Sequence, residues 1–223
     1  MTDAVKSEWV DEALTHFSAV LADPDSADCR YNLAVWLAGA ERWDAAAQEF
    51  GRALWLDPRR EAAAIGLGAC LLKLNRAEEA LEVFTQAARE PGPTWFGKAT
   101  ALQLLRRFDE AQSAYETFLE SEPNSQETLG NLIAMSAETH DLEHMREYSQ
   151  KLLSLAPQSA AALQGLATVA LERRDHHAAA RYCDRIVEAA PDCLEGWHNL
   201  RIALDGILSA FTAQPAASIP GVE

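Results

Sequence analysis

The sequence predicts an all-α protein built from repeated pairs of helices. Its 223 residues include 42 Ala and 28 Leu but only 14 Val plus Ile. This composition favours helices, because Ala and Leu lose little freedom in a helix whereas β-branched residues are enriched in strands. Prolines indicate a period: Pro24 and Pro58 lie 34 residues apart, and Pro123, Pro157 and Pro191 follow one another at the same interval. We therefore expect a chain of similar units.

Each unit has the spacing of two amphipathic helices. In residues 27–60, Leu33, Ala34 and Leu37 share one face of a first helix, and Ala46 and Phe50 follow on a second. Small residues at these positions let neighbouring helix backbones approach closely. The later units carry equivalent residues: Leu67, Gly68, Leu71, Ala80 and Phe84; Trp95, Ala99, Leu102, Ala111 and Tyr115; Leu132 and Ile133; Leu166, Ala167 and Ala179.

This pattern resembles the tetratricopeptide repeat family, whose 34-residue helix-turn-helix units stack into a solenoid. The resemblance covers roughly residues 5–210 and implies an all-α, right-handed α-solenoid with capping helices. It divides the chain into one solenoid over residues 1–211, with an N-terminal helix at 5–21, repeats at about 27–60, 61–92, 93–125, 126–159 and 160–193, and a capping helix at 194–211. Residues 212–223 contain two prolines and little to bury, so we expect a disordered tail.

Two departures from the pattern have physical interpretations. Three residues are missing near Pro91-Gly92-Pro93, where two prolines forbid a continuous helix, and this predicts a local change in superhelix angle. In the last two repeats Ser149 and Cys183 replace the aromatic residue, while Leu152 and Ile186 replace the small residue three places later. Volume is exchanged between neighbours, which protein cores tolerate well.

Composition also excludes several classes of function. The formal charge is −15, with 34 acidic against 19 basic residues, so phosphate neutralisation and nucleic-acid binding are not expected. No segment approaches 18 uncharged apolar residues, and Met1–Val10 lacks the apolar core of a secretion signal, which predicts neither a membrane span nor a membrane partner. The four cysteines form no CxxC pair. Reduced thiols and a cytoplasmic location are the expectation.

The resemblance places a binding surface on the first helix of each repeat, which lines the concave face of such solenoids. Because the seventh, eighth and eleventh residues of that helix point to the core, its fifth, sixth, ninth and twelfth residues face away from the core. The candidate peptide-binding residues are Tyr31, Asn32, Val35, Ile65, Ala69, Leu72, Phe96, Thr100, Gln103, Asn131, Gln164 and Asn199. The amino-terminal half of this surface is apolar and nearly uncharged.

Two binding modes remain open on this surface. Asparagines at the sixth position of the first helix, such as Asn32, can pair with the backbone of an extended peptide, because a side-chain amide both donates and accepts hydrogen bonds. Glycines at the same position in other repeats, Gly66 and Gly97, suit a helical or bulky apolar guest by lowering the floor of a groove. Alternatively the asparagines bond only to neighbouring turns. The family's basic clamp for a terminal carboxylate is not expected, since Tyr31, Val35 and Gly66 occupy its places.

Histidines raise the possibility of a metal site. His140 and His144 form an H-x-x-E-H pattern that is shared with one class of zinc peptidase. The repeat phase, however, puts His140 in a turn and His144 on the following helix, so the two do not share one helix face. His176 and His177 fall at the same turn one repeat later. We expect solvated turn residues here, with neither metal nor cofactor, although a bridged surface metal remains conceivable.

The sequence thus predicts a non-enzymatic protein-protein interaction module, an adaptor or a chaperone-like holder, because no nucleophile is accompanied by an assigned base. Its concave groove would receive a peptide or helix of a partner protein. An acidic chain favours apolar or basic guests, since like charges repel. Two alternatives remain open: a self-assembling scaffold that forms a homo-oligomer, and a regulatory subunit of an enzyme on another chain.

Overall fold

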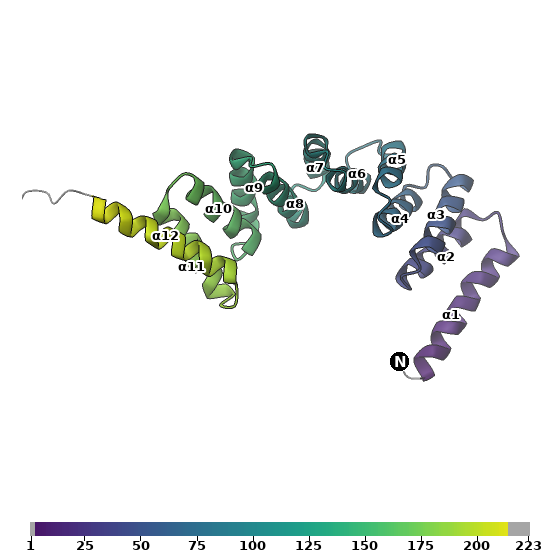
Figure 1. Ribbon diagram of the computed structural model, residues 1–223. Coiled ribbons are helices and arrows are strands. Elements are labelled where there is room, and N and C mark those ends of the chain that lie inside the picture. Colours follow the sequence, from purple (N-terminus) through teal and green to yellow (C-terminus); the bar gives the residue numbers. More distant parts are fainter. Residues whose placement is uncertain (1–2, 214–223) are drawn as a thin grey trace, which may run out of the picture. The chain divides into compact units, whose positions relative to one another are not determined.

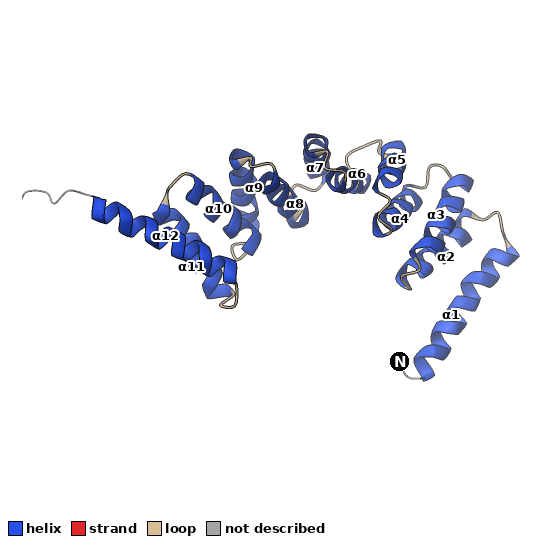
Figure 2. Cartoon of the chain, viewed as in Figure 1, coloured by secondary structure: helices blue, strands red, loops and turns tan. Residues whose placement is uncertain are grey.

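The computed structural model describes residues 3–213, with side chains from residue 12 to residue 212. Within this part of the chain the regular structure is entirely helical, as Figures 1 and 2 show. The predicted all-α fold of repeated helix pairs is confirmed. The first helices of the pairs are α2 (Ala27–Gly39), α4 (Glu61–Lys73), α6 (Pro93–Leu104), α8 (Gln126–Glu138) and α10 (Ala160–Glu172).

The second helices are α3 (Trp43–Leu56), α5 (Ala77–Ala87), α7 (Phe108–Ser121), α9 (Leu142–Leu155) and α11 (His176–Ala189). Terminal helices α1 (Asp3–Ala22) and α12 (Leu194–Ala213) flank the five pairs. Thr212 and Ala213, placed in the tail by the sequence, are the last residues of α12. The remainder of the expected tail, residues 214–223, lies outside the described residues.

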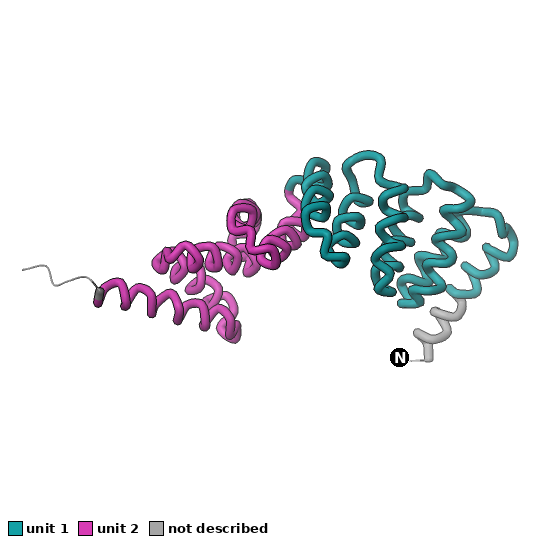
Figure 3. The backbone as a smooth tube through the Cα atoms, turned by 45° about the horizontal axis from the view of Figure 1, so that its top comes forward, with its two compact units in different colours: residues 1–123 teal, residues 124–223 magenta. Residues whose placement is uncertain are grey.

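The chain divides into two compact units, residues 1–123 and 124–223, which are coloured separately in Figure 3. Unit 1 contains α1 to α7 and unit 2 contains α8 to α12. The single solenoid over residues 1–211, with its repeat boundaries, remains a prediction.

One backbone turn recurs between the first and second helix of every pair. The residue that breaks each first helix has a left-handed conformation, with φ between 56° and 59°; these residues are Glu41, Asn75, Arg106, His140 and Arg174. The next amide then donates to a carbonyl of the preceding helix, as from Arg42 to Leu37 at 2.9 Å. This bond satisfies a carbonyl that the helix end leaves free. The repeated turn sets the antiparallel pairing of the helices.

The core of each pair is a small residue beside a large one. In unit 1 the buried pairs are Ala46 with Phe50, Ala80 with Phe84, and Ala111 with Tyr115. In unit 2 Ser149 and Cys183 are fully buried, and Leu152 and Ile186 are buried three residues later. The exchange of volume between neighbouring core positions, expected from the sequence, therefore keeps all of these positions inside the protein.

The Pro91-Gly92-Pro93 segment ends one helix and begins the next. Helix α5 stops at Ala87 and is the shortest of the described helices. Pro93 is the first residue of α6, a position that proline suits because its missing N–H would have no helical partner there. Helix α5 is three residues shorter than the other second helices and α6 is one residue shorter than the other first helices of the pairs, whereas the connection between them, residues 88–92, is one residue longer than the corresponding connections.

Candidate functional site

The first helices form an inner layer within each unit. In unit 1 α2 contacts α4 and α4 contacts α6, while α3 packs against α2 and α4 and α5 packs against α4 and α6. In unit 2 the first helices α8 and α10 likewise contact each other, and α10 contacts α12. Second helices therefore lie outside a row of adjoining first helices, so the solvent-facing stripes of the first helices lie beside one another.

The twelve candidate residues all keep some exposure, and none of them is buried. Nine belong to unit 1 and lie on α2, α4 and α6, whereas Asn131, Gln164 and Asn199 belong to unit 2 and lie on α8, α10 and α12. Asn32, Val35 and Ala69 are exposed and the others are half-buried. The structure brings the nine into one row of helices, and the asparagines are divided between the two units.

An apolar stripe runs along α4 in the middle of this row. Ile65, Ala69 and Leu72 recur at intervals of four and three residues, which places them on one face of the helix. Val35 on the adjoining helix α2 is 47% exposed. We call these four residues the inner apolar patch. It has no charged side chain among its members, and Lys73 stands at its edge at the end of α4.

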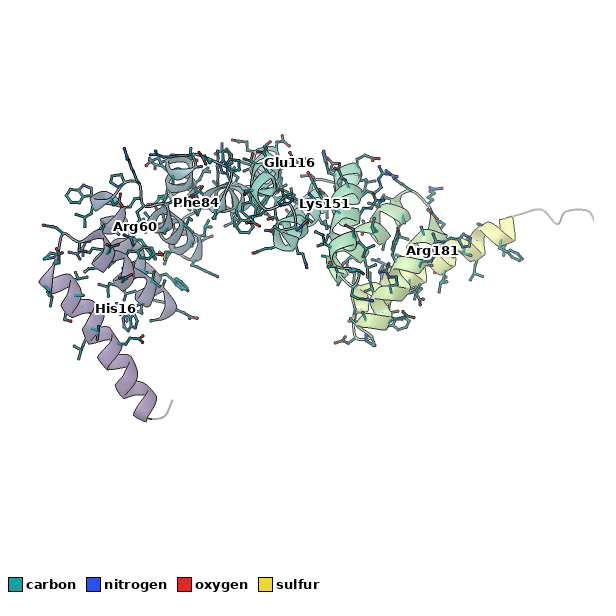
Figure 4. The ribbon with its side chains drawn as sticks, turned by 180° about the vertical axis from the view of Figure 1, so that it is seen from behind. His16, Arg60, Phe84, Glu116, Lys151 and Arg181 are labelled. Carbon is teal, nitrogen blue, oxygen red and sulfur yellow. The ribbon has the colours of Figure 1, made fainter. Side chains whose placement is uncertain are left out.

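Tyr31 lies in a packed cluster beside the patch. Its ring meets the Phe50 ring edge to face at 5.6 Å between centroids, and the Arg60 guanidinium carbon lies 4.4 Å from the Tyr31 ring centroid. Arg60, labelled in Figure 4, also forms an ion pair with the carboxylate of Asp28. This cation–π contact and ion pair join α2 to the start of α4. Sequence spacing gave no signal for Arg60, because side-chain reach between helices decides the contact.

Phe96, Thr100 and Gln103 come together around the buried residue Tyr115. The ring of Phe96 lies 5.7 Å from that of Tyr115 and 5.4 Å from that of Phe118. The Tyr115 hydroxyl donates to Gln103 Oε1 at 2.9 Å and lies 3.3 Å from Thr100 Oγ1. These three candidates are therefore engaged with α7, and much of their capacity for contacts is already used within unit 1.

The glycines of the first helices have a different role from the one we expected. A Cβ on Gly66 would lie 2.5 Å from the Phe50 ring, one on Gly97 would lie 2.3 Å from the Phe84 ring, and one on Gly165 would lie 2.3 Å from Ser149 Oγ. The interpretation that they lower the floor of a groove is wrong. Each makes room for a side chain of the preceding second helix, so the space is filled by the protein itself.

The histidine turns have the geometry that the repeat phase predicts. His140 is the left-handed residue of its turn, while His144 lies in the first turn of α9. Asp141 caps α9 through its Oδ1 and lies 2.6 Å from His144 Nδ1 through its Oδ2. The side-chain hydrogen bond with His144 lowers the pKa of Asp141. In the part of the chain that the structure describes, no group of three His, Cys, Asp or Glu residues is arranged to hold a metal ion.

Trp55 is a large exposed apolar residue outside the inner layer, where packing between repeats would have buried it. Trp55 on α3 is 79% exposed and lies among the second helices rather than the inner layer. Among the described helices none combines the length and apolar character that a membrane span needs.

Comparisons with known proteins agree with this architecture. The family model described as tetratricopeptide repeat matches residues 37–93, and that of the coatomer epsilon subunit matches residues 75–170. A comparison with curated proteins finds no match.

Several solved structures share the fold. YrrB, described as a TPR protein with an unusual peptide-binding site, is 19% identical with a TM-score of 0.73, over 85% of this chain and 99% of that one. PilF of Pseudomonas aeruginosa is 20% identical with a TM-score of 0.70, over 87% of this chain and 90% of that one. MamA from Desulfovibrio magneticus is 17% identical with a TM-score of 0.68, over 75% and 97%.

These likenesses concern the fold. The repeated helix pairs, the recurring left-handed turn and the family match over residues 37–93 are consistent with one another. Together they show that the chain has the repeated helix-turn-helix fold of tetratricopeptide repeat proteins, with a match to that family's model over residues 37–93.

Proposed function

We propose that the chain is a protein-interaction module and that unit 1 receives an apolar segment of a partner protein on its inner apolar patch. The observation that carries this proposal is the uncharged stripe of Ile65, Ala69 and Leu72 on α4, beside the exposed side chain of Val35 on α2. A patch of this kind gains free energy when a partner removes it from water.

Polar and aromatic groups at the border of the patch would orient a guest. Asn32 is exposed one turn before Val35, and its amide can both donate to and accept from a peptide backbone. Tyr31 on α2 and Phe96 on α6 are half-buried on the two helices that adjoin α4. An apolar floor with a few polar groups is the usual composition of a site that recognises a peptide segment.

The charge of the chain favours particular guests. With a formal charge of −15, the protein repels acidic segments over a distance of about one Debye length, and basic residues flanking an apolar core would speed the encounter. The peptide-binding site of YrrB, which has the same fold, supports the proposal by example. Adaptor, chaperone-like and enzyme-regulating roles are narrower forms of this function. Identifying the guest protein would distinguish among them.

A random peptide library selected against the full chain tests the proposal. We expect enriched peptides with apolar side chains, and we expect Ala69→Glu to weaken their binding by about tenfold or more, because a buried unpaired charge is costly. Ala69 is exposed and helical, so the variant should keep its helix content. Trp55→Glu, at an exposed position on α3, is the matched control and should bind normally. Equal binding by wild type and Ala69→Glu would remove the patch as the site.

A further inference from the structure

Helix α12 exposes positions that are buried in the preceding first helices of unit 2. The fourth, eighth and eleventh residues of α8 are Leu129, Ile133 and Ser136, and those of α10 are Leu163, Ala167 and Ala170; all six are at most 7% exposed. In α12 the same positions hold Trp197 at 49% exposure, Arg201 with a 66% exposed side chain, and Leu204 at 47%. These are positions that a following second helix covers in a complete pair, and no such helix follows α12 within the described residues.

The exposed stripe continues along the whole of α12. Leu194, Leu208 and Phe211 are 84%, 62% and 77% exposed. With Trp197, Arg201 and Leu204 they recur at alternating intervals of three and four residues, the spacing of a helix-pairing seam. We call these six residues the α12 seam. At 20 residues α12 is also longer than the 13-residue first helices α8 and α10, so the seam is longer than one repeat requires.

A different stripe of α12 attaches the helix to its own unit. A Cβ on Gly196 would lie 2.9 Å from Ile186, and one on Gly206 would lie 2.4 Å from the His176 ring. Ala203 is fully buried and packs in a cluster with Ala170 and Ala179. The sequence predicted that this helix would shield the end of the protein. It does cover α11, but it presents a second apolar stripe to solvent in doing so.

We propose that the α12 seam pairs with the α12 seam of a second copy of this chain in an antiparallel arrangement. Such a pair is two-fold symmetric, so each contact is made twice. If the two-fold axis passes midway between Arg201 and Leu204, Leu194 of one copy lies opposite Phe211 of the other, and Trp197 lies opposite Leu208. Apolar side chains then meet apolar side chains along both ends of the seam, and a single seam is complementary to itself.

Charge selects a second copy and this direction of pairing. In the antiparallel arrangement Arg201 and the neighbouring His198 of one copy approach Asp205 of the other, and the same contact recurs by symmetry. Arg201 and Asp205 form an exposed ion pair within one helix, with 3.4 Å between Arg201 Nη1 and Asp205 Oδ2, and in the dimer each side chain would also face an opposite charge on the second helix. A parallel pair would instead bring Arg201 against Arg201, and like charges in contact oppose association.

The expected dimer is weak. Two 20-residue helices contact each other over at most about 30 Å, and one such contact is smaller than the standard protein interface of about 1,200–2,000 Å². We therefore expect association in the micromolar range. Because the seam lies in unit 2 and the inner apolar patch in unit 1, guest binding and dimer formation can succeed or fail independently.

Sedimentation equilibrium of the full chain over micromolar concentrations tests the pairing. Wild type should pass from monomer to dimer as concentration rises, and Leu204→Glu should remain monomeric with unchanged helix content. Leu21→Glu, at an 80% exposed position on α1, is the matched control and should dimerise as wild type does. A wild type that stays monomeric throughout, a Leu204→Glu variant that still dimerises, or a dimer lost through Leu21→Glu would overturn the proposal.

Charge exchange tests the antiparallel direction. A variant with His198→Asp and Arg201→Asp has acidic groups on both sides of the contact, and Asp205→Arg has basic groups on both sides. Each alone should dimerise about tenfold more weakly than wild type, and an equimolar mixture should recover a heterodimer, because its acidic and basic groups then face each other. A mixture no stronger than its separate components would contradict the antiparallel pair.

Discussion

The ring of Phe84 lies against the backbone of Gly97, where an added Cβ would come within 2.3 Å of two ring carbons. Both residues are buried, and the same ring has a similar relationship with Gly68, where an added Cβ would lie 2.3 Å from the nearest ring carbon. Phe84, labelled in Figure 4, thus joins its own helix α5 to the first helices before and after it. One aromatic side chain and two glycines determine how closely α4 and α6 approach.

Gly97→Ala should therefore destabilise unit 1. Overpacking against the Phe84 ring costs about 1–3 kcal/mol, whereas alanine improves helix propensity by about 1 kcal/mol, so we expect a net loss of up to about 2 kcal/mol in the free energy of urea unfolding. Gly51→Ala on α3 is the control, because a Cβ there would meet none of the described residues within 4 Å. That variant should gain about 0.5–1 kcal/mol. If Gly97→Ala and Gly51→Ala changed the free energy of unfolding in the same direction, this account of the glycines would be contradicted.

Ser149→Ala should stabilise unit 2. The buried Ser149 hydroxyl has no hydrogen-bond partner among the described residues, and an unsatisfied buried group costs about 1–3 kcal/mol. Ser136 is the matched comparison, since its buried hydroxyl donates to the Leu132 carbonyl at 2.8 Å. Thermal unfolding should show a gain of about 1 kcal/mol for Ser149→Ala and no gain for Ser136→Ala. A loss of stability in Ser149→Ala would show that the hydroxyl has a partner.

The coupling of Asp141 and His144 should depend on pH. Because the hydrogen bond with His144 lowers the pKa of Asp141, the pair stabilises the folded state above the ordinary aspartate pKa of about 3.9 and loses this effect as the pH falls through the lowered value. A double-mutant cycle of Asp141→Asn and His144→Ala should give a coupling below about 1 kcal/mol, since both side chains are well exposed. The coupling measured near pH 5 should vanish in strong acid; persistence there would contradict the assignment.

Two of the four cysteines should resist alkylation in the folded protein. Cys70 and Cys183 are buried, and burial raises the pKa of each thiol, so little reactive thiolate forms at neutral pH. Cys29 and Cys193 are half-buried and should react first with iodoacetamide. Mass spectrometry after a timed reaction gives the order directly. Equal rates for all four residues would mean that the two helix pairs open readily.

Much of the fold follows from the sequence because every repeat carries its own signals. Leu33, Ala34 and Ala46 are buried where helix spacing puts them, and the helices come in the pairs that the 34-residue period predicts. The shared turn was less visible. Its left-handed position holds Asn75 once but Glu41, Arg106 and others elsewhere, and most of these residue types give no signal for that conformation.

The candidate site is harder to predict, because contacts between side chains of different repeats decide which of its residues stay exposed. A glycine such as Gly97 indicates a close approach, but the sequence does not say whether a guest or the protein's own Phe84 approaches. The contact of Arg60 with Tyr31 depends in the same way on side-chain reach. The sequence does carry a signal for the α12 seam, since Leu204, Leu208 and Phe211 continue an apolar spacing beyond the length of a first helix.

Photo-crosslinking from the inner apolar patch tests the central claim most directly. A benzophenone amino acid placed at position 69 on α4, or as a control at position 55 on α3, is irradiated with a peptide selected by the full chain. If guests lie on the patch, the adduct forms from position 69, and unlabelled peptide competes it away. Adducts from position 55 with none from position 69 would show that partners bind the outer helices instead.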